Sequence, residues 1–308
     1  TRTKNPNPSI SITNTKPRPP ETTFPTPSSS TEQIPDNYLY DTVISGGRVI
    51  DPETGFDSIA HVGIEGKSIS KISFDPLVGR KTLEATGLIV SPGFIDILSY
   101  PVNGYGDWYK IADGVTSNLC MHGMDNPTDK FLSQAADLAP PVNYGGAVDH
   151  YEHRKRFKRK SDSSQVIGIQ RSTPSERIEL LRLAERDLEA GALGIHQQPE
   201  YTVDLELSEM ISHGELATRY NVPMFLHVRF SENNQPGTQS EALNEALEVA
   251  LATGCAVHIE HINSTGGTGR MKAAIAQLQT AKDKGVSVTA CIYPYTYWAT
   301  NAGTARFN

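Results

Sequence analysis

After Pro92 the sequence alternates short apolar runs with amphipathic stretches of helical length, and this alternation limits the possible folds more than any other feature. The apolar runs, which we expect to be strands, are residues 94–98, 116–121, 143–150, 192–196, 223–228, 256–261 and 287–292. Repeated strand–helix units of this length predict parallel strands joined by right-handed crossovers. Seven such strands indicate a (β/α)8 TIM barrel, of which this chain holds seven of the eight strands. A doubly wound open sheet is the alternative.

Two of the predicted helices carry clear end signals. Thr173 can cap a helix that has Pro174 at its first position, and Glu176 can close a capping box. A second helix is expected over residues 240–252, with Gly254 as its stop signal. Both helices support the strand–helix alternation.

The chain divides into three parts by composition. Residues 1–38 are rich in Pro, Ser, Thr and Asn, and they predict a disordered tether because they bury too little apolar surface to offset their ordering entropy. Residues 39–91 contain short β runs punctuated by Gly and Asp-Pro, which predict hairpins in a small sheet. Residues 92–308 form the incomplete barrel. Such tethers often follow the cleavage site of exported or lipid-anchored proteins, so we expect an exported location, with a cytoplasmic one as the alternative.

The bulk composition argues against several classes of partner. The net charge of -7 and the pI of about 5.7 disfavour nucleic acid, because phosphate binding needs a basic face. The basic run at residues 153–160 is the exception, and we interpret it as a solvated loop. No apolar run approaches the ~20 residues that a transmembrane helix needs. The three cysteines lie in apolar runs and give no disulfide framework.

Histidines follow five successive predicted strands, at or just after the point where each strand ends. They are His122, His150, His196, His227 and His261. In a parallel barrel the C-terminal strand ends form the reactive face, so these side chains are expected to meet at one mouth. Neutral imidazole is a common metal ligand, and zinc takes three or four donors.

Side-chain alternation along the sixth predicted strand separates its polar residues. If His261 points into the barrel, Val257 and Ile259 do so too, whereas His258 and Glu260 face the helices. We therefore set His258 aside despite its closeness to His261.

Several stretches resemble one enzyme family. DTVISGGRVIDPETGFDSIAHVGIEGKSISKI followed by LEATGLIVSPGFIDI is similar to the opening of the amidohydrolase superfamily. EAGALGI, EYTVDLELSEMISHGELATRYNVPMFLHVR, AVHIEHINSTGG and GVSVTACIYPYTYWAT resemble its N-acyl-D-amino-acid deacylase (D-aminoacylase-like) branch. The resemblance covers about residues 40–300. It implies a barrel of amidohydrolase type with a small β-sandwich, and metal-dependent cleavage of an amide C–N bond.

The resemblance also implies roles for single residues. His227 in LHVR and His261 in IEHI match metal ligands of the fifth and sixth strands. His150 matches a substrate-side histidine, and Arg229 matches a residue near the substrate carboxylate. The positions that match pocket walls are Tyr201 and Tyr293. One divalent metal, with zinc preferred, and a small-molecule N-acyl amino acid or related amide are the expected ligands.

The sequence departs from the family pattern at three strand ends. The family's His-x-His on the first strand is Leu98-Ser99-Tyr100 here, and leucine cannot bind a metal. We place Tyr100 on the substrate side. The second-strand ligand region reads CMHGM, so either His122 or Cys120 can replace the family's ligand. His196 stands where the family has Ser-Thr-Gly, and it is a further candidate donor.

The family's eighth strand brings the catalytic aspartate. We expect that strand and the end of the sandwich beyond Asn308, from a missing C-terminal segment or a second polypeptide, because a barrel without its last strand exposes two unpaired edges. Asp96 is the internal candidate for the base. The family pattern, however, places Asp96 lower in the barrel, where it fixes backbone.

These observations leave three functional hypotheses. The first is a metal-dependent hydrolase that cleaves an amide bond, with a carboxylate that moves the proton from water to the leaving amine. The second is a catalytically inactive structural or assembly subunit, which the lost His-x-His favours. The retained histidines disfavour it, because buried imidazoles without partners are costly. The third is a metal-dependent lyase or isomerase, since one fold hosts many chemistries.

Overall fold

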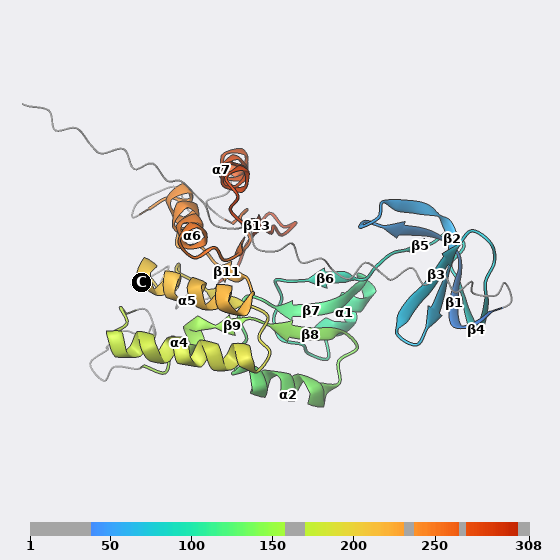
Figure 1. Cartoon of the computed structure of the whole chain (residues 1–308), viewed down its shortest axis with the longest axis horizontal. Coiled ribbons are helices and arrows are strands. Elements are labelled where there is room, and N and C mark those ends of the chain that lie inside the picture. The colour runs from blue at the N-terminus through green and yellow to red at the C-terminus, as the bar shows by residue number, and fades with distance from the viewer. Residues whose placement is uncertain (1–37, 158–169, 231–236, 265–268, 301–308) are drawn as a thin grey trace, which may run out of the picture. The chain divides into compact units, whose positions relative to one another are not determined.

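The computed structural model of the chain describes residues 38–157, 170–230, 237–264 and 269–300 (Figure 1). It divides into two compact units, Thr1–Pro92 and Gly93–Asn308. Of the predicted tether, all but Tyr38 lies outside the described residues.

The first unit contains one five-stranded sheet in its described part. The strands are β1 (Leu39–Asp51), β2 (Phe56–Glu65), β3 (Ser68–Ser73), β4 (Val78–Glu84) and β5 (Ile89–Val90). Their order is β3-β2-β1-β4, and β5 also pairs with β1. The β1–β2 and β2–β3 pairs are antiparallel, as hairpins require, whereas β4 and β5 run parallel to β1. A single sheet is therefore present, and the β-sandwich stays a prediction.

All strand pairs of the second unit are parallel. The strands are β6 (Phe94–Asp96), β7 (Val115–Cys120), β8 (Asn143–Gly146), β9 (Val148–Asp149), β10 (Ile195–Gln197), β11 (Met224–Leu226), β12 (Val257–Ile259) and β13 (Val288–Ala290). They form two sheets, β6-β7-β8 and β9-β10-β11-β12-β13. Each of the seven predicted strands is therefore found, although most of them are shorter than predicted.

One run of chain links the two sheets of the second unit. β8 and β9 are consecutive and are separated only by Ala147. The Ala147 amide donates to the Cys120 carbonyl on β7 (3.0 Å), whereas the Val148 amide donates to the Gly194 carbonyl just before β10 (2.9 Å). The strands thus follow each other in sequence order without the reversal of a doubly wound sheet. In the described part β6 and β13 do not pair, so the closed barrel stays a prediction.

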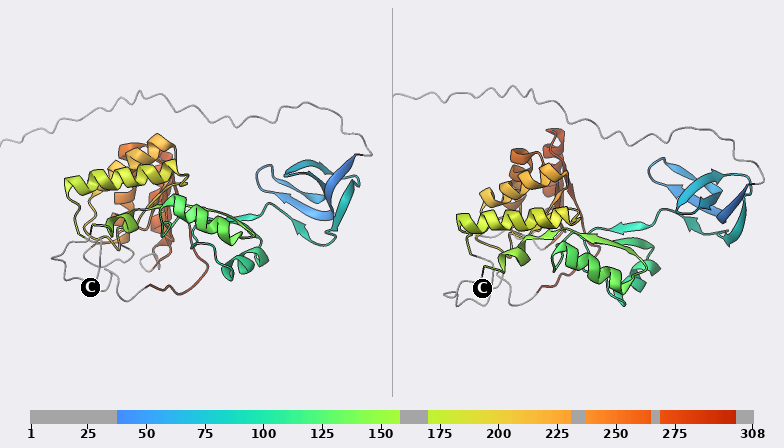
Figure 2. Two further views of the ribbon diagram at one scale, coloured as in Figure 1. Left: turned by 90° about the horizontal axis from the view of Figure 1, so that it is seen from below. Right: turned by 60° about the horizontal axis from the view of Figure 1, so that its bottom comes forward.

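Helices connect the strands and pack side by side from α4 through α5 and α6 to α7 (Figures 1 and 2). Their bounds are α1 (Gly106–Ala112), α2 (Thr128–Leu138), α3 (His150–Arg154), α4 (Pro174–Glu189), α5 (Leu207–Tyr220), α6 (Gln239–Thr253) and α7 (Met271–Asp283). The expected capping box of Thr173 and Glu176 begins α4, and Gly254 ends α6 at a φ of 74°. None of the helices in the described part has the length and apolar composition needed to cross a bilayer.

The core of the second unit lies between the strands and these helices. Ile195, Met224, Leu226 and Ile259 are fully buried on neighbouring strands, and they pack in one cluster with Leu243 of α6. Because this core fixes the strands from β9 to β13, it also fixes the positions of the residues that follow them.

Candidate metal centre

Four side chains that follow three strands converge on one point. His122 follows β7, His227 follows β11, and Glu260 and His261 follow β12. One donor atom from each lies within 4.8 Å of the other three. The ring centroids of His227 and His261 are 4.4 Å apart, and those of His122 and His227 are 5.6 Å apart. Three imidazoles are donors that zinc and related divalent metals accept, and a carboxylate can either join them or hydrogen-bond to a ligand imidazole.

The surroundings of these four groups fit a metal. Nδ1 of His227 and Oε1 of Glu260 are buried and have no hydrogen-bond partner in the described part of the chain. Buried polar atoms without partners are costly, and such atoms call for an unobserved water or ion. The donor atoms present at this site therefore fit a divalent metal ion.

Glu260 is the residue that sequence reasoning assigned wrongly. The expectation that Glu260 faces the helices is contradicted, because its carboxylate Oε2 lies 2.5 Å from Nδ1 of His122. Alternation holds only within a strand, and β12 ends at Ile259. The chain then turns, with His261 at a φ of 29°, so that two adjacent side chains reach the same site. The one available signal was that Glu260 directly precedes a predicted ligand.

His196 lies beside the four groups rather than among them. It is fully buried on β10, and its ring centroid lies 4.5 Å from that of His122. Its Nε2 is 3.5 Å from Oε2 of Glu260, and neither ring nitrogen has a hydrogen-bond partner in the described part. Of the four predicted metal ligands, the structure brings three together and places His196 next to them. The ligand roles themselves stay predictions.

The buried carboxylate dominates the electrostatics of this group. Burial on its own would raise the pKa of Glu260, but His122 and His196 outweigh it and hold that pKa well below its ordinary value. Burial would lower the pKa of His122, yet Glu260 raises it above the ordinary value. Burial and the neighbouring His227 lower the pKa of His261 to about 4. His261 is therefore neutral near pH 7, the form that binds metals.

A different tyrosine lies beside each of the three histidines. The ring centroids are 4.8 Å apart for Tyr201 and His227, 6.3 Å for Tyr293 and His261, and 6.3 Å for Tyr100 and His122. Tyr100 is 76% exposed, so it lies on the side of His122 that faces solvent. The three tyrosines predicted on the substrate side are thus all next to the candidate metal centre.

Arg229 and His150 have other partners. The Arg229 guanidinium donates to the Glu245 carboxylate at 2.8 Å and to the backbone carbonyls of Val203 and Leu205. The third strand ends at Asp149 instead of His150, and His150 begins α3. Its ring is fully buried, with Nε2 2.9 Å from Oε1 of Glu209. The structure places neither residue among the four converging groups.

An ion pair lies beside Leu98-Ser99-Tyr100, the stretch where the resemblance implies the two first-strand histidines. Lys110 of α1 pairs with Asp96 of β6, and it also donates to the Ser99 hydroxyl at 2.6 Å. The Asp96 carboxylate accepts the backbone amide of Leu98 at 3.2 Å. The Asp96 carboxylate therefore already has a backbone amide and a lysine as partners, and its role as a base stays a prediction.

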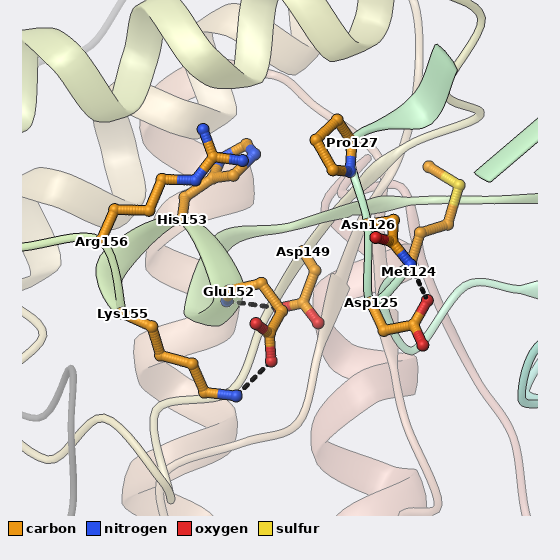
Figure 3. A pocket seen from close by; sticks show the side chains of 9 residues that line it. All are labelled: Met124, Asp125, Asn126, Pro127, Asp149, Glu152, His153, Lys155 and Arg156. Carbon is orange, nitrogen blue, oxygen red and sulfur yellow. Dashed lines mark hydrogen bonds and ion pairs between the residues drawn. The ribbon is translucent and has the colours of Figure 1, made fainter. Parts of the chain in front are cut away.

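A pocket of about 290 Å³ is lined by residues that follow His122 in the chain and by residues in and next to α3. Figure 3 shows Asp149 and Glu152 facing Asp125 and Asn126 across it. Burial raises the pKa of Asp149 to about 7. A side chain at Gly123 would come within 2.9 Å of both Oδ2 of Asp149 and Nδ1 of His196, so the loop that carries His122 packs closely against both groups.

Comparisons with known proteins find relatives in sequence and in structure. No family model matches the sequence. N-acyl-D-glutamate deacylase of Alcaligenes xylosoxydans xylosoxydans is 29% identical over 288 residues, which cover 83% of this chain and 57% of the relative. A dihydroorotase of Geobacter metallireducens is 26% identical, with 84% and 62% covered. This chain thus spans less than two thirds of the length of either relative.

Solved structures show the same fold. The structure of N-acyl-D-glutamate deacylase from Bordetella bronchiseptica, in complex with zinc and a phosphonate inhibitor, has a TM-score of 0.72 at 22% identity. The match covers 84% of this chain and 59% of the other. A D-aminoacylase structure has a TM-score of 0.70 at 23% identity, covering 83% and 59%. At these identities the likeness concerns the fold.

Proposed function

We propose that this chain, whose homologues are amidohydrolases of the D-aminoacylase branch, carries the metal centre of a hydrolase that cleaves an amide C–N bond. The observation that carries the proposal is the convergence of His122, His227, Glu260 and His261 within 4.8 Å at the C-terminal ends of parallel strands. That end is where enzymes of this architecture place their chemistry.

The residues of the chain would have separate roles in metal binding and in substrate binding. His122, His227 and His261 would hold one divalent metal, with zinc preferred. When bound, that metal supplies a polarised carbonyl and a water of lowered pKa. The three neighbouring tyrosines would line the substrate pocket and limit the access of bulk water. Since Asp96 is paired with Lys110, we expect the proton-transferring carboxylate to come from outside the described residues.

The proposed substrate is an N-acyl amino acid or a related amide. Its support is that a sequence relative is an N-acyl-D-glutamate deacylase, and that side chains able to bind a metal converge in this chain. An exported location is proposed only on the composition of residues 1–38.

An eighth strand, from a further segment or a second polypeptide, would complete the barrel. Within the described part, β6 and β13 each have a single strand neighbour. Apolar side chains on β6 and just after β13 are exposed, with Phe94 63%, Ile95 62% and Ile292 66% accessible. Exposed apolar edges of this kind mark a surface that is paired in the working protein. Mass spectrometry of the protein isolated from its source tests this, and the absence of any further barrel sequence would remove the idea.

One observation favours a second candidate, an inactive assembly subunit. The first strand end holds the ammonium group of Lys110 between Asp96 and Ser99 instead of presenting two metal ligands. A protein that kept this fold but no longer catalysed hydrolysis would tolerate an ion pair in place of two metal ligands.

Metal content and hydrolysis test the proposal together. The full chain should retain about one zinc per chain after dialysis, and His227→Ala should lose it. His258→Gln is the matched control, because Nδ1 of His258 contacts Thr289 on β13 at 2.8 Å, outside the four converging groups. N-acyl-D-amino acids should then release carboxylate and free amine. Bound zinc without release in the completed protein favours the inactive subunit, and no bound zinc contradicts the metal centre.

A further inference from the structure

Two histidines of the candidate metal centre are each held by a buried glutamate. Nε2 of His227 lies 2.6 Å from Oε2 of Glu200, and both side chains are less than a tenth exposed. Nδ1 of His122 lies 2.5 Å from Oε2 of Glu260, which is fully buried. The two contacts use opposite nitrogens of the imidazole ring.

These contacts fix where each neutral ring carries its proton. An ionised carboxylate only accepts hydrogen bonds, so the ring nitrogen that faces it must be the protonated one. The other nitrogen then carries the lone pair that can bind a metal. For His227 that nitrogen is Nδ1, which is buried and has no hydrogen-bond partner in the described part. For His122 it is Nε2.

We propose that Glu200 and Glu260 are positioning residues that orient His227 and His122 toward one metal ion, an inference that rests on the proposed metal centre. Histidines that bind metals usually donate their second N–H to a carboxylate, a carbonyl or water. Such partners set the ring orientation and make the ligand nitrogen more basic. Because Leu98-Ser99-Tyr100 offers no metal-binding pair on the first strand, the remaining histidines have to be well oriented.

Glu200 and Glu260 come from different parts of the fold, so they can be tested independently. Glu200 precedes Tyr201 in the stretch after β10, and Glu260 follows β12. Glu260 also has an oxygen, Oε1, without a hydrogen-bond partner among the described residues. Glu200→Gln and Glu260→Gln keep the shape of each side chain and remove its charge.

The zinc dissociation constant of the full chain, measured by competition with a chelator, is the first readout. Each variant should bind zinc about 10–100-fold more weakly than the unsubstituted chain. Glu209→Gln is the matched control, because it removes a buried carboxylate that contacts His150 at 2.9 Å, and its zinc binding should be unchanged. If Glu200→Gln and Glu260→Gln bind zinc as tightly as the unsubstituted chain, the positioning role is wrong while the metal centre stands. If the unsubstituted chain binds none, the metal centre and this role fall together.

The second readout needs no substitution. Nitrogen-15 NMR of the metal-free chain, at an alkaline pH where the rings are neutral, reports which ring nitrogen carries hydrogen. His122 should be the Nδ1–H tautomer and His227 the Nε2–H tautomer. Finding the proton of His122 on Nε2 would overturn the role of Glu260, even if the Glu260→Gln variant fails to fold. The corresponding result for His227, a proton on Nδ1, would overturn the role of Glu200.

Discussion

At the residue scale, the histidines of the candidate metal centre and His150 have different surroundings. Those of the candidate metal centre have donor atoms that lie close to one another. His150 instead belongs to a network with Glu209 and Arg154, in which Arg154 donates to the same Glu209 oxygen at 2.7 Å. The ring of His213 lies against His150, with centroids 4.7 Å apart. We infer that this second network is structural, because its charges are paired with one another.

The His150 network predicts a pH dependence of stability. Burial lowers the pKa of His150 to about 3, below its ordinary value of 6.5. Between these values the unfolded chain binds a proton that the folded chain does not, so stability is lost as the pH falls below 6.5. At about pH 5 the loss from this residue amounts to about 2 kcal/mol.

The free energy of unfolding in urea, measured from pH 6.5 to about 5, checks this dependence. His150→Gln should show a shallower fall with pH than the unsubstituted chain, because it removes one titrating group. Burial on its own would raise the pKa of Glu209, but His150 and Arg154 outweigh it and hold that pKa below its ordinary value. This carboxyl therefore affects stability mainly at lower pH, where it becomes protonated. Equal slopes in the two proteins would contradict this account of His150.

At the element scale, the short loop after β7 positions His122. Gly123 has a φ of 93°, a conformation that favours glycine, and it packs against Asp149 and His196. The loop after β7 is therefore in contact with residues of β9 and β10. Sequence reasoning found His122 as a candidate, yet it could not choose between His122 and Cys120. Cys120 is the last residue of β7 and is fully buried, whereas His122 lies in the loop, and that difference depends on where the strand ends.

A substitution at Gly123 tests this role of the loop. Gly123→Ala should lower stability by about 1–3 kcal/mol through backbone strain alone, and it should weaken zinc binding because the added methyl would displace the loop. Gly254→Ala is the control, because Gly254 has a φ of 74° and open space around it. It should carry the strain without affecting zinc. Unchanged zinc affinity in Gly123→Ala, measured by the same chelator competition, would show that the loop does not position His122.

At the scale of the whole molecule, the strand–helix alternation predicted an α/β fold with parallel strands, and the structure confirms it. The resemblance to the D-aminoacylase branch is also confirmed by the homologues. Glu260 could not be found in the same way, because its direction depends on a turn after Ile259 that the period of a strand does not describe. Glu200 was missed because nothing in its local sequence marks a partner for His227.

The ion pair of Lys110 and Asp96 was also beyond sequence reasoning. The two residues are 14 positions apart, and their meeting depends on how α1 packs after β6. The order of the strands can be predicted from a pattern that repeats along the sequence. The pairing of side chains that lie far apart in the sequence depends on how the elements pack in three dimensions. The candidate centre was therefore predicted through its histidines, and its carboxylates came from the structure.

The most direct test of the account is anomalous diffraction at the zinc edge from crystals of the full chain grown with zinc. We predict one peak about 2.0–2.1 Å from nitrogens of His122, His227 and His261. The absence of a peak there, or a metal held by other residues while these three rings lie apart, would contradict it.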